Sequence, residues 1–480
     1  MTPSEHRGSI TGRQRAATLA LFGTAALHLA WNAWETIPLT GYDAGAHAGY
    51  LLTLVDESRL PHPMEGWATF HPPLYYLLGA GIWSLLEPLG PRAVVTGLRA
   101  LGGIALLAAG YVALRVVLHS TGRFAVAWVA AALVLFLPMA QLSAAMIGNE
   151  AFAAGLTALA IPPLLALQRD PRHLPTAAVT GLMAGLAFIT KFTGAFVVIA
   201  CVVPFLRRDF DPSMARALIA GALAGALIAA PVYARNVLLT GTPFPILREH
   251  EPTRTQEARN VLRPRRVSDY LWVDPGSLQR PSIYHIRGES NSELRRNYAM
   301  TNVWGLTYAA IWYDAFAHRI PVSFHRDGVL SGPLLTALGV IPTLLVLMGY
   351  ALALAAAVRS RGRSEDAPLV VLASVGLVMF IGFTSWAQSV VAVKGSYLLP
   401  LLIPASAFFG RAVSWFARDL QRAALGFSTA AALACAVIFT HGLVFPAQPM
   451  EKMPRTWRIL GAHLPGSHIA PSVDRLTRGW

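Results

Sequence analysis

The chain has 480 residues, of which 54% are apolar and only 13% are charged. A soluble chain usually carries about a quarter charged residues, so the composition excludes an ordinary soluble enzyme and a disordered chain. Lys and Arg number 39 against 25 Asp and Glu, which gives a formal net charge of +14. In a membrane protein, such an excess lies mainly in cytoplasmic loops and near anionic headgroups. No basic stripe with interleaved aromatic residues appears, which argues against nucleic-acid binding.

Apolar runs long enough to cross a bilayer recur along the whole chain. A spanning helix needs roughly twenty mostly apolar residues. We predict transmembrane spans at 16–37, 93–118, 124–146, 151–167, 174–190, 192–206, 217–234, 331–357, 367–387, 396–411 and 425–445. The predicted fold class is therefore an all-α polytopic membrane protein with about 11 transmembrane helices.

Arginine groups predict the orientation, because cytoplasmic loops are enriched in Lys and Arg. We place the N-terminus inside, the C-terminus outside, and these groups in the cytoplasm: Arg7, Arg13 and Arg15; Arg115 and Arg123; Arg169 and Arg172; Arg207 and Arg208; Arg359, Arg361 and Arg363; Arg418 and Arg422. They share one side only if the apolar stretch 71–89 does not cross and is a re-entrant or interfacial helix. If the stretch 71–89 crosses the membrane, the number of transmembrane helices becomes about twelve. The first span could also be a signal peptide, but Trp31 and Trp34 suit an interfacial anchor, so we keep it as a span.

This topology places two hydrophilic stretches outside. Residues 1–235 would form a catalytic membrane module that includes the first outer loop, 38–70. Residues 236–330 would form an outer, partly helical cap, and 331–445 the C-terminal transmembrane helices. A short outer tail, 446–480, would follow.

The interior of the predicted spans carries little chemistry. No Asp or Glu lies in the interior of the spans after the first, which argues against proton-coupled or ion-coupled transport. Cys201 and Cys435 both lie inside apolar runs, so we predict neither a disulfide nor a metal cluster.

The unusual polar residues gather instead at the outer ends of the spans and in the first outer loop. The candidate site residues are Asp43, His47, His71, Tyr76, Arg99, Glu150, Lys191, Arg235, Asn236, Lys394 and Tyr397. Carboxylates beside basic groups at a membrane surface could serve a reaction between a lipid phosphate and a hydroxyl. The basic groups would hold the phosphate, and a carboxylate would take the hydroxyl proton.

Each candidate also has a structural interpretation. Asp43 could cap the helix 44–57, a role compatible with catalysis. His47 could be an interfacial histidine, and Glu150 an acid favoured at a helix start. The basic residues at the span ends could be snorkelling anchors, and the remaining polar residues could serve packing.

Several motifs, taken in order, resemble those of the GT-C class of membrane glycosyltransferases. The similarity is greatest to bacterial relatives of protein O-mannosyltransferases and of the lipid A aminoarabinose transferase. The motifs are Tyr42-Asp43, Leu60-Pro61, His71-Pro72-Pro73-Leu74-Tyr75-Tyr76, Asn149-Glu150, Thr190-Lys191-Phe192-Thr193, Arg235-Asn236, Gly241-Thr242-Pro243-Phe244, and Lys394-Gly395-Ser396-Tyr397-Leu398-Leu399-Pro400. They cover residues 16–411, and the stretch from Asp43 to Tyr76 is the most specific.

The resemblance implies an inverting transferase that takes a sugar from a polyprenyl-phosphate carrier. Asp43 matches the family's catalytic carboxylate and would deprotonate the acceptor hydroxyl, while Glu150 matches a second acid at the same cavity. Lys191, with His71 and Arg235, would stabilise the departing phosphate. The acceptor would be a protein, lipid or glycan of the cell envelope, reached from the extracytoplasmic side of the inner membrane. No cofactor is implied, and the sequence leaves a divalent metal open.

The sequence also departs from the family pattern. Ala44 stands where many relatives have a second acid, and no Asp-x-Asp pair occurs near Asp43. Only about 35 residues follow 445, so acceptor recognition would fall to 236–330. Two other functions remain: a non-catalytic GT-C-fold protein that binds lipid, and a lipid or solute transporter, which would need a polar path through the membrane.

Overall fold

The computed structural model describes residues 11–206, 208–245, 265–279, 281–282, 301–317, 320, 331–386, 393–445 and 476. Every regular element within these ranges is a helix, which confirms the all-α prediction. The α-helices are α1 (Gly12–Glu35), α2 (Ala44–Glu57), α3 (Leu74–Leu86), α4 (Pro91–Thr121), α5 (Phe124–Phe136), α6 (Pro138–Ala144), α7 (Glu150–Arg169), α8 (Leu174–Phe188), α9 (Ala195–Ala200), α10 (Pro212–Thr240), α12 (Ser268–Leu271), α14 (Val303–Trp312), α16 (Ser331–Arg359), α17 (Ala367–Trp386), α18 (Leu402–Trp415) and α19 (Arg418–Ile438). The 3₁₀ helices are η1 (Glu87–Leu89), η2 (Phe192–Gly194), η3 (Val203–Phe205), η4 (Pro275–Leu278) and η8 (Gly395–Leu401). The predicted tail and much of the predicted cap lie outside the described residues.

Among the described residues, seven helical segments are long and apolar enough to cross a membrane, so the chain is a multi-pass membrane protein. They are α4, α7, α10, α16, α17, α19 and Gly395–Trp415, which joins η8 to α18. An eighth results if α5 and α6 form one span, bent by 51° where Leu137 precedes Pro138. The other predicted spans correspond to α1 and to two shorter apolar segments, Leu174–Phe188 and Phe192–Phe205, so the count of about 11 stays a prediction.

Two predicted spans differ in the structure. The span predicted at 425–445 begins earlier, because the polar first turn of α19 at Arg418 continues the helix beyond the apolar run. The span predicted at 192–206 is divided into η2, α9 and η3. A Cβ on Gly194 would overlap the backbone of Ala187, so this glycine lets the chain turn back tightly against α8.

Local sequence signals set the ends of the long helices. The Asp211 side chain accepts hydrogen bonds from the backbone N–H groups of Ser213 and Met214, and Pro212 takes the first helical position of α10. The same helix ends at Gly241, whose φ of +74° is the left-handed conformation favoured by glycine. These signals place Arg235 and Asn236 in the last turns of α10.

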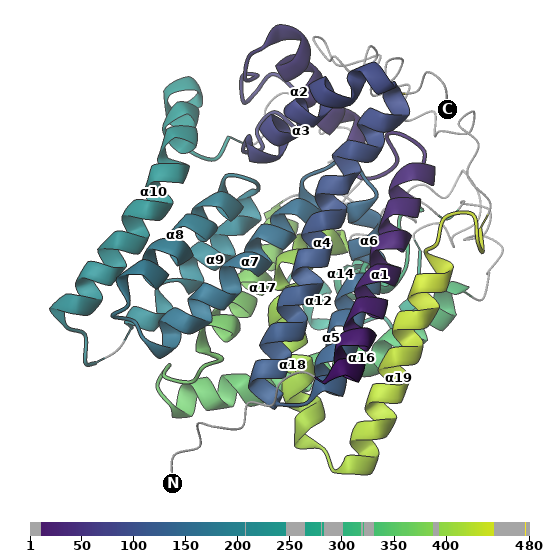
Figure 1. Cartoon of the computed structure of the whole chain (residues 1–480), viewed down its shortest axis with the longest axis vertical. Coiled ribbons are helices and arrows are strands. Elements are labelled where there is room, and N and C mark those ends of the chain that lie inside the picture. The colour runs from purple at the N-terminus through teal and green to yellow at the C-terminus, as the bar shows by residue number, and fades with distance from the viewer. Residues whose placement is uncertain are drawn as a thin grey trace.

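The helix α4 runs through the middle of the molecule and packs against α1, α5, α7 and α18 (Figure 1). Small residues allow close contacts along it. A Cβ on Gly155 of α7 would lie 2.5 Å from the Cβ of Ala105, and one on Gly102 would lie 3.2 Å from the Cα of Ala144. Close approach of helix backbones at small residues is a common means of packing membrane helices.

The helices α2 and α3 lie together at the upper end of the molecule in Figure 1. α3 has 13 residues and is therefore roughly 20 Å long, at 1.5 Å per residue. A bilayer core is about 30 Å thick, so α3 is too short to cross it. This length favours the interpretation of 71–89 as an interfacial or re-entrant segment.

Ion pairs join several helix ends at the other end of the molecule. Arg169 Nε lies 3.0 Å from Glu365 Oε1, and Arg172 Nε lies 2.7 Å from Asp211 Oδ2. The end of α7, the start of α10 and the loop between α16 and α17 therefore meet at one face. Arginine groups that we assigned to the cytoplasm are thus close together in space.

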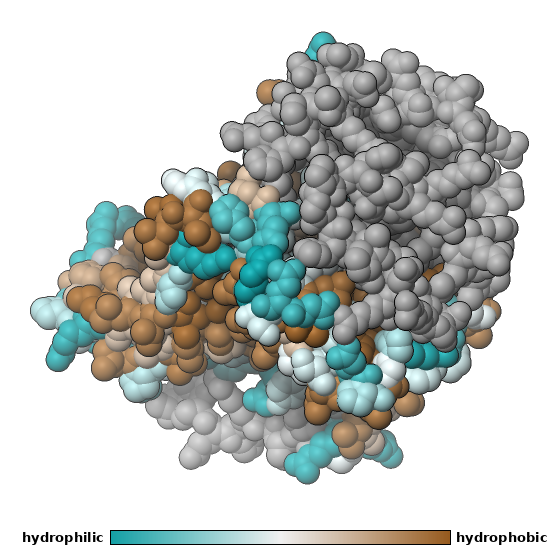
Figure 2. All heavy atoms as spheres, turned by 90° about the horizontal axis from the view of Figure 1, so that it is seen from above, coloured by the Kyte–Doolittle hydropathy of each residue, from teal (hydrophilic) through white to brown (hydrophobic). Residues whose placement is uncertain are grey.

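The pair α8 and α10 forms an apolar flank. Among the described elements, α8 is the main packing partner of α10. Leu223 and Leu227 on the outer face of α10 are 65% and 77% exposed. Figure 2 shows the flank from above as a largely apolar surface. Such a surface suits contact with lipid tails.

Candidate active site

Four charged side chains form an alternating chain at the upper end of the helices. Lys394 Nζ lies 3.3 Å from Asp43 Oδ2 and 3.8 Å from Glu150 Oε1. Lys191 Nζ lies 2.8 Å from the same Glu150 oxygen. The Lys191, Glu150 and Lys394 side chains are less than 10% exposed, whereas that of Asp43 is 37% exposed. Residues more than 350 positions apart in the chain thus meet in one cluster, and Asp43 is its most accessible member.

Each charged residue sits where a helix begins. Asp43 precedes α2, Glu150 is the first residue of α7, Lys191 precedes η2 and Lys394 precedes η8. Asn149 helps to align two of these starts, because its side-chain amide donates to the carbonyl of Thr190. Burying a charge is costly unless it is paired, and the cluster pairs two acids with two lysines.

Asp43 does not cap α2 with its side chain, so that part of the sequence interpretation is wrong. Its backbone is left-handed, with φ 55° and ψ 15°, and its carbonyl accepts the first helical hydrogen bond from the N–H of His47. Asp and Asn tolerate this conformation better than most residues. The carboxylate is thereby directed to other partners: Oδ2 to Lys394 and Oδ1 to the indole N–H of Trp67, at 3.0 Å.

Asp43 and Lys394 strongly influence each other's pKa. Burial alone would raise the pKa of Asp43, but the Lys394 ammonium, with help from His47, holds the pKa of Asp43 below its ordinary value. Burial would lower the pKa of Lys394, but Tyr397, Asp43 and Glu150 raise it. Asp43 is therefore a carboxylate, and Lys394 an ammonium, at neutral pH.

Two tyrosine rings surround the lysines. Lys394 Nζ lies 4.7 Å from the centre of the Tyr42 ring and 5.0 Å from that of Tyr397. Lys191 Nζ lies 5.5 Å from the centre of the Tyr397 ring. These are cation–π distances, so the rings stabilise both buried ammonium groups.

Two histidines lie beside the charged chain. His47 Nδ1 is 2.6 Å from the Tyr76 hydroxyl, and the His47 ring stacks on that of His71 with centres 5.5 Å apart. Burial lowers the pKa of His47 to about 4, and burial also lowers the pKa of His71 well below its ordinary value. Both rings are therefore neutral at physiological pH and do not act as cations, and the His47 ring is hydrogen-bonded to Tyr76.

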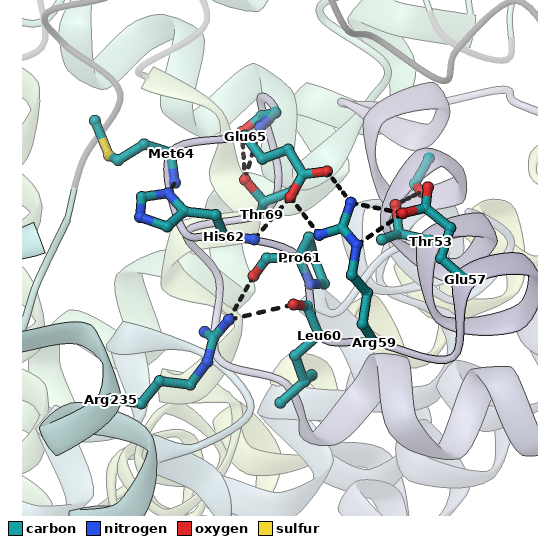
Figure 3. A network of polar contacts seen from close by, with 12 residues as sticks. Thr53, Glu57, Arg59, Leu60, Pro61, His62, Met64, Glu65, Thr69 and Arg235 are labelled. Carbon is teal, nitrogen blue, oxygen red and sulfur yellow. Dashed lines mark hydrogen bonds and ion pairs between the residues drawn. The ribbon is translucent and has the colours of Figure 1, made fainter. Parts of the chain in front are cut away.

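Three predicted site residues bind backbone carbonyls outside the cluster. Arg99 donates to the carbonyls of residues 33, 36 and 37 at the end of α1. Arg235 donates to the carbonyls of residues 60 and 61 in the first outer loop (Figure 3). Asn236 donates to the carbonyl of Pro243. These contacts hold the surroundings of the site in place.

The sequence interpretation missed two neighbours of the charged chain, Trp67 and the Tyr42 ring. A Trp in an outer loop is usually taken for a membrane anchor, so nothing in the pattern distinguished Trp67. Tyr42 stands directly before Asp43 and was noted only as part of a motif. Its ring contact with Lys394 depends on the fold.

Each lysine is followed, two residues later in the chain, by a residue with an unpaired hydroxyl. Ser396 Oγ and Thr193 Oγ1 are buried without a hydrogen-bond partner among the described residues, and so is His71 Nδ1. A buried polar group without a partner is unfavourable, so such atoms indicate a place for a ligand. The described residues contain no group of three or more His, Cys, Asp or Glu side chains able to hold a metal.

No protein-family model and no curated protein matches the sequence. In structure, the chain is similar to the oligosaccharyltransferase AglB from Archaeoglobus fulgidus. The AglB structure tethered to an acceptor peptide gives a TM-score of 0.52 at 13% identity, covering 96% of this chain and 59% of that chain. The AglB complex with an inhibitory peptide and a dolichol-phosphate gives a TM-score of 0.50 at 14% identity, covering 98% of this chain and 60% of that chain. The structure of ArnT from Cupriavidus metallidurans gives a TM-score of 0.38 at 16% identity, covering 83% of this chain and 77% of that chain.

The chain thus spans about three-fifths of the length of the AglB structures. At these identities the similarity concerns the fold alone. The chain has the membrane fold of the GT-C glycosyltransferases, as the resemblance in sequence implied.

Proposed function

We propose that this protein is an inverting glycosyltransferase that moves a sugar from a polyprenyl-phosphate carrier to a hydroxyl of an envelope acceptor. The site would face the extracytoplasmic side of the inner membrane. The observation that carries the proposal is the alternating chain Asp43–Lys394–Glu150–Lys191. A partly exposed carboxylate stands at one end of this chain, and a buried lysine stands at the other. The two ends match the two needs of glycosyl transfer, a base and an anion site.

Lys191 and Lys394 would bind the phosphate of the donor. An arriving phosphate oxygen could replace the Glu150 carboxylate as the partner of both ammonium groups, and the free hydroxyls of Ser396 and Thr193 could donate to it. The structurally similar AglB was solved with a dolichol-phosphate, which supports a lipid phosphate as the ligand class. The exposed apolar flank of α8 and α10 would contact the isoprenoid chain of the donor.

The chemical step would be a single displacement. The acceptor O–H gives its proton to the Asp43 carboxylate while its oxygen forms a bond to the anomeric carbon. The bond between that carbon and the phosphate oxygen breaks, and its electron pair leaves with the lipid phosphate. Attack from the face opposite the leaving group inverts the anomeric centre. Lys191 and Lys394 stabilise the charge that develops on the leaving oxygen.

Donor binding would also activate the base. Without donor, Lys394 holds Asp43 in an ion pair and keeps its pKa low. A low pKa makes a weak base. When a phosphate draws Lys394 toward itself, Asp43 loses part of this stabilisation and becomes a stronger base. Deprotonation of the acceptor would thus follow donor binding.

Two substitutions separate the proposed base from the proposed anion site. Asp43→Asn keeps a residue that tolerates the left-handed backbone, so the fold should persist. We expect it to lower sugar transfer from polyprenyl-phosphate donors at least about a thousandfold, while undecaprenyl phosphate binding in nanodiscs changes little. Lys191→Gln should weaken undecaprenyl phosphate binding about tenfold or more, because it removes a charge-assisted contact.

The matched control is Asp170→Asn, the same chemical change at the C-terminal end of α7. It should leave both transfer and binding unchanged. Full transfer activity in Asp43→Asn would reject Asp43 as the base. Lipid-phosphate binding with no transfer from any carrier-linked sugar would favour the non-catalytic alternative.

A further inference from the structure

Trp67 shares the proposed catalytic carboxylate with Lys394. Its indole N–H donates to Asp43 Oδ1 at 3.0 Å, while Lys394 occupies Oδ2. Lys394 leads to Glu150 and Lys191, the proposed phosphate end of the site. Trp67 therefore contacts the carboxylate oxygen that Lys394 does not.

The Trp67 side chain donates a hydrogen bond through its indole N–H and is otherwise partly exposed. It is 45% exposed although its N–H is fixed to the carboxylate of Asp43. A tryptophan that only anchors a loop in the membrane interface would direct its N–H to water or headgroups. Here the N–H points to Asp43, so the partly exposed indole lies directly beside the proposed catalytic carboxylate.

The loop that carries Trp67 is braced from several directions (Figure 3). The Arg59 guanidinium donates both to Glu57 and, through two nitrogens, to Glu65. Thr69 accepts a hydrogen bond from the N–H of Gly66 and donates to the loop carbonyls.

A second brace comes from the membrane helices. Arg235 of α10 donates to the carbonyls of Leu60 and Pro61, at 3.3 Å and 2.7 Å. The loop that carries the exposed ring is thus held both through the carboxylate of Glu65 and through two backbone carbonyls. A fixed aromatic surface suits recognition, because little conformational freedom is lost on binding.

We propose that the exposed indole of Trp67 is the acceptor platform and that the acceptor is a carbohydrate. This inference rests on the proposed function. One face of a sugar ring carries C–H groups and packs against an aromatic face, while its hydroxyls stay at the rim. A sugar stacked on Trp67 would present a rim hydroxyl to Asp43, within the distance that a general base requires.

Sugar binding in nanodiscs made without glycolipids or sugar detergents tests this proposal. The probes are methyl pyranosides and methyl furanosides at millimolar concentration, observed by saturation-transfer NMR, beside a peptide containing Ser and Thr. We expect saturable binding of at least one glycoside to the unmodified protein and to Trp67→Phe. Trp67→Leu should weaken that binding about tenfold, because the aromatic face is lost.

The matched control is Trp415→Leu, which removes a 68% exposed indole from the last residue of α18. It should bind the glycosides as the unmodified protein does. Glycoside binding that is unchanged in Trp67→Leu would overturn the proposal. The proposal would also fail if the peptide binds in a way that depends on Trp67 and no glycoside binds. Undecaprenyl phosphate binding is measured in the same samples. If undecaprenyl phosphate still binds but no sugar binds through Trp67, only the inference about the acceptor fails. If undecaprenyl phosphate does not bind, the proposed function fails.

Discussion

At the scale of single residues, the chemistry of this protein depends on which partner each charge finds. Basic residues near the outer span ends look alike in sequence, but the structure divides them into two groups. Lys191 and Lys394 face carboxylates, whereas Arg99 and Arg235 bind backbone carbonyls. An ammonium that faces a carboxylate can exchange it for a phosphate. A guanidinium that donates to several backbone carbonyls is held in place by the fold and is less available to a ligand.

Lys394 should control the pH dependence of transfer. The base must be deprotonated, so the rate falls as pH drops through the pKa of Asp43. That pKa lies below its ordinary value, so we expect no loss of base between pH 8 and about pH 5. Lys394→Gln removes the main stabilising charge and leaves burial, which raises the pKa. The acidic limb of log kcat/KM against pH should therefore move to higher pH.

The control for this prediction is Lys394→Arg, which keeps the positive charge beside Asp43. Its acidic limb should stay near that of the unmodified protein, whatever its absolute rate. The polyprenyl-phosphate donor is a phosphodiester with no ionisation in this range. An acidic limb that does not move in Lys394→Gln would contradict the assignment of Asp43 as the base.

At the scale of elements, the close packing of α8 and α10 in the apolar flank depends on four glycines. Gly181 and Gly185 of α8 face Gly221 and Gly225 of α10, so the two backbones come close together. A Cβ on Gly181 would overlap the Gly221 carbonyl, and one on Gly185 would lie 2.9 Å from the Gly225 carbonyl oxygen. Because α8 is the main described partner of α10, this contact sets the position of Arg235 and of the loop that it braces.

Gly181→Ala should therefore destabilise the protein. Overpacking of this kind costs about 1–3 kcal/mol, which a lower thermal unfolding temperature in nanodiscs would show. Gly426→Ala in α19 is the matched control, because a Cβ there meets no atom within 4 Å. That substitution should be neutral or slightly stabilising, since Ala favours a helix interior. Equal unfolding temperatures for the two variants would contradict the close packing of α8 and α10.

The elements themselves were largely predictable, because length and apolarity are properties of each segment alone. The spans at 93–118, 331–357 and 367–387 all correspond to single helices. Breaks were less predictable. The bend before Pro138 follows from a local signal, but the division of 192–206 depends on Gly194 packing against α8, which is a tertiary contact.

The site was predictable as a set of residue types but not as a set of contacts. Asp43, Glu150, Lys191 and Lys394 were chosen because charges at span ends are unusual, and the structure brings all four together. The orientation of Asp43 was not predictable, because its left-handed backbone turns the carboxylate away from the helix that it begins. Trp67 was missed for the same reason, since only the fold shows that its N–H meets this carboxylate.

At the scale of the whole molecule, the two ends have different chemistry. The proposed site lies at the end that holds α2 and α3, and paired arginines and acids gather at the other end (Figure 1). A transporter would need a polar path that joins the two ends. The charged chain from Asp43 to Lys191 instead lies among helix starts at one end, which favours transfer at a surface over transport.

Sided labelling tests this arrangement in cells. Ser58→Cys places an exposed thiol in the first outer loop, and Glu365→Cys places one in the loop between α16 and α17. The positive-inside rule puts the arginine-rich end in the cytoplasm. A membrane-impermeant maleimide should therefore label Ser58→Cys in intact cells and Glu365→Cys only after permeabilisation. The native Cys435 is buried and Cys201 is half-buried, so labelling of the unmodified protein measures the background under each condition. Labelling of both variants from the same side would mean that the two ends do not face opposite sides of the membrane. The extracytoplasmic assignment of Asp43 would then fail.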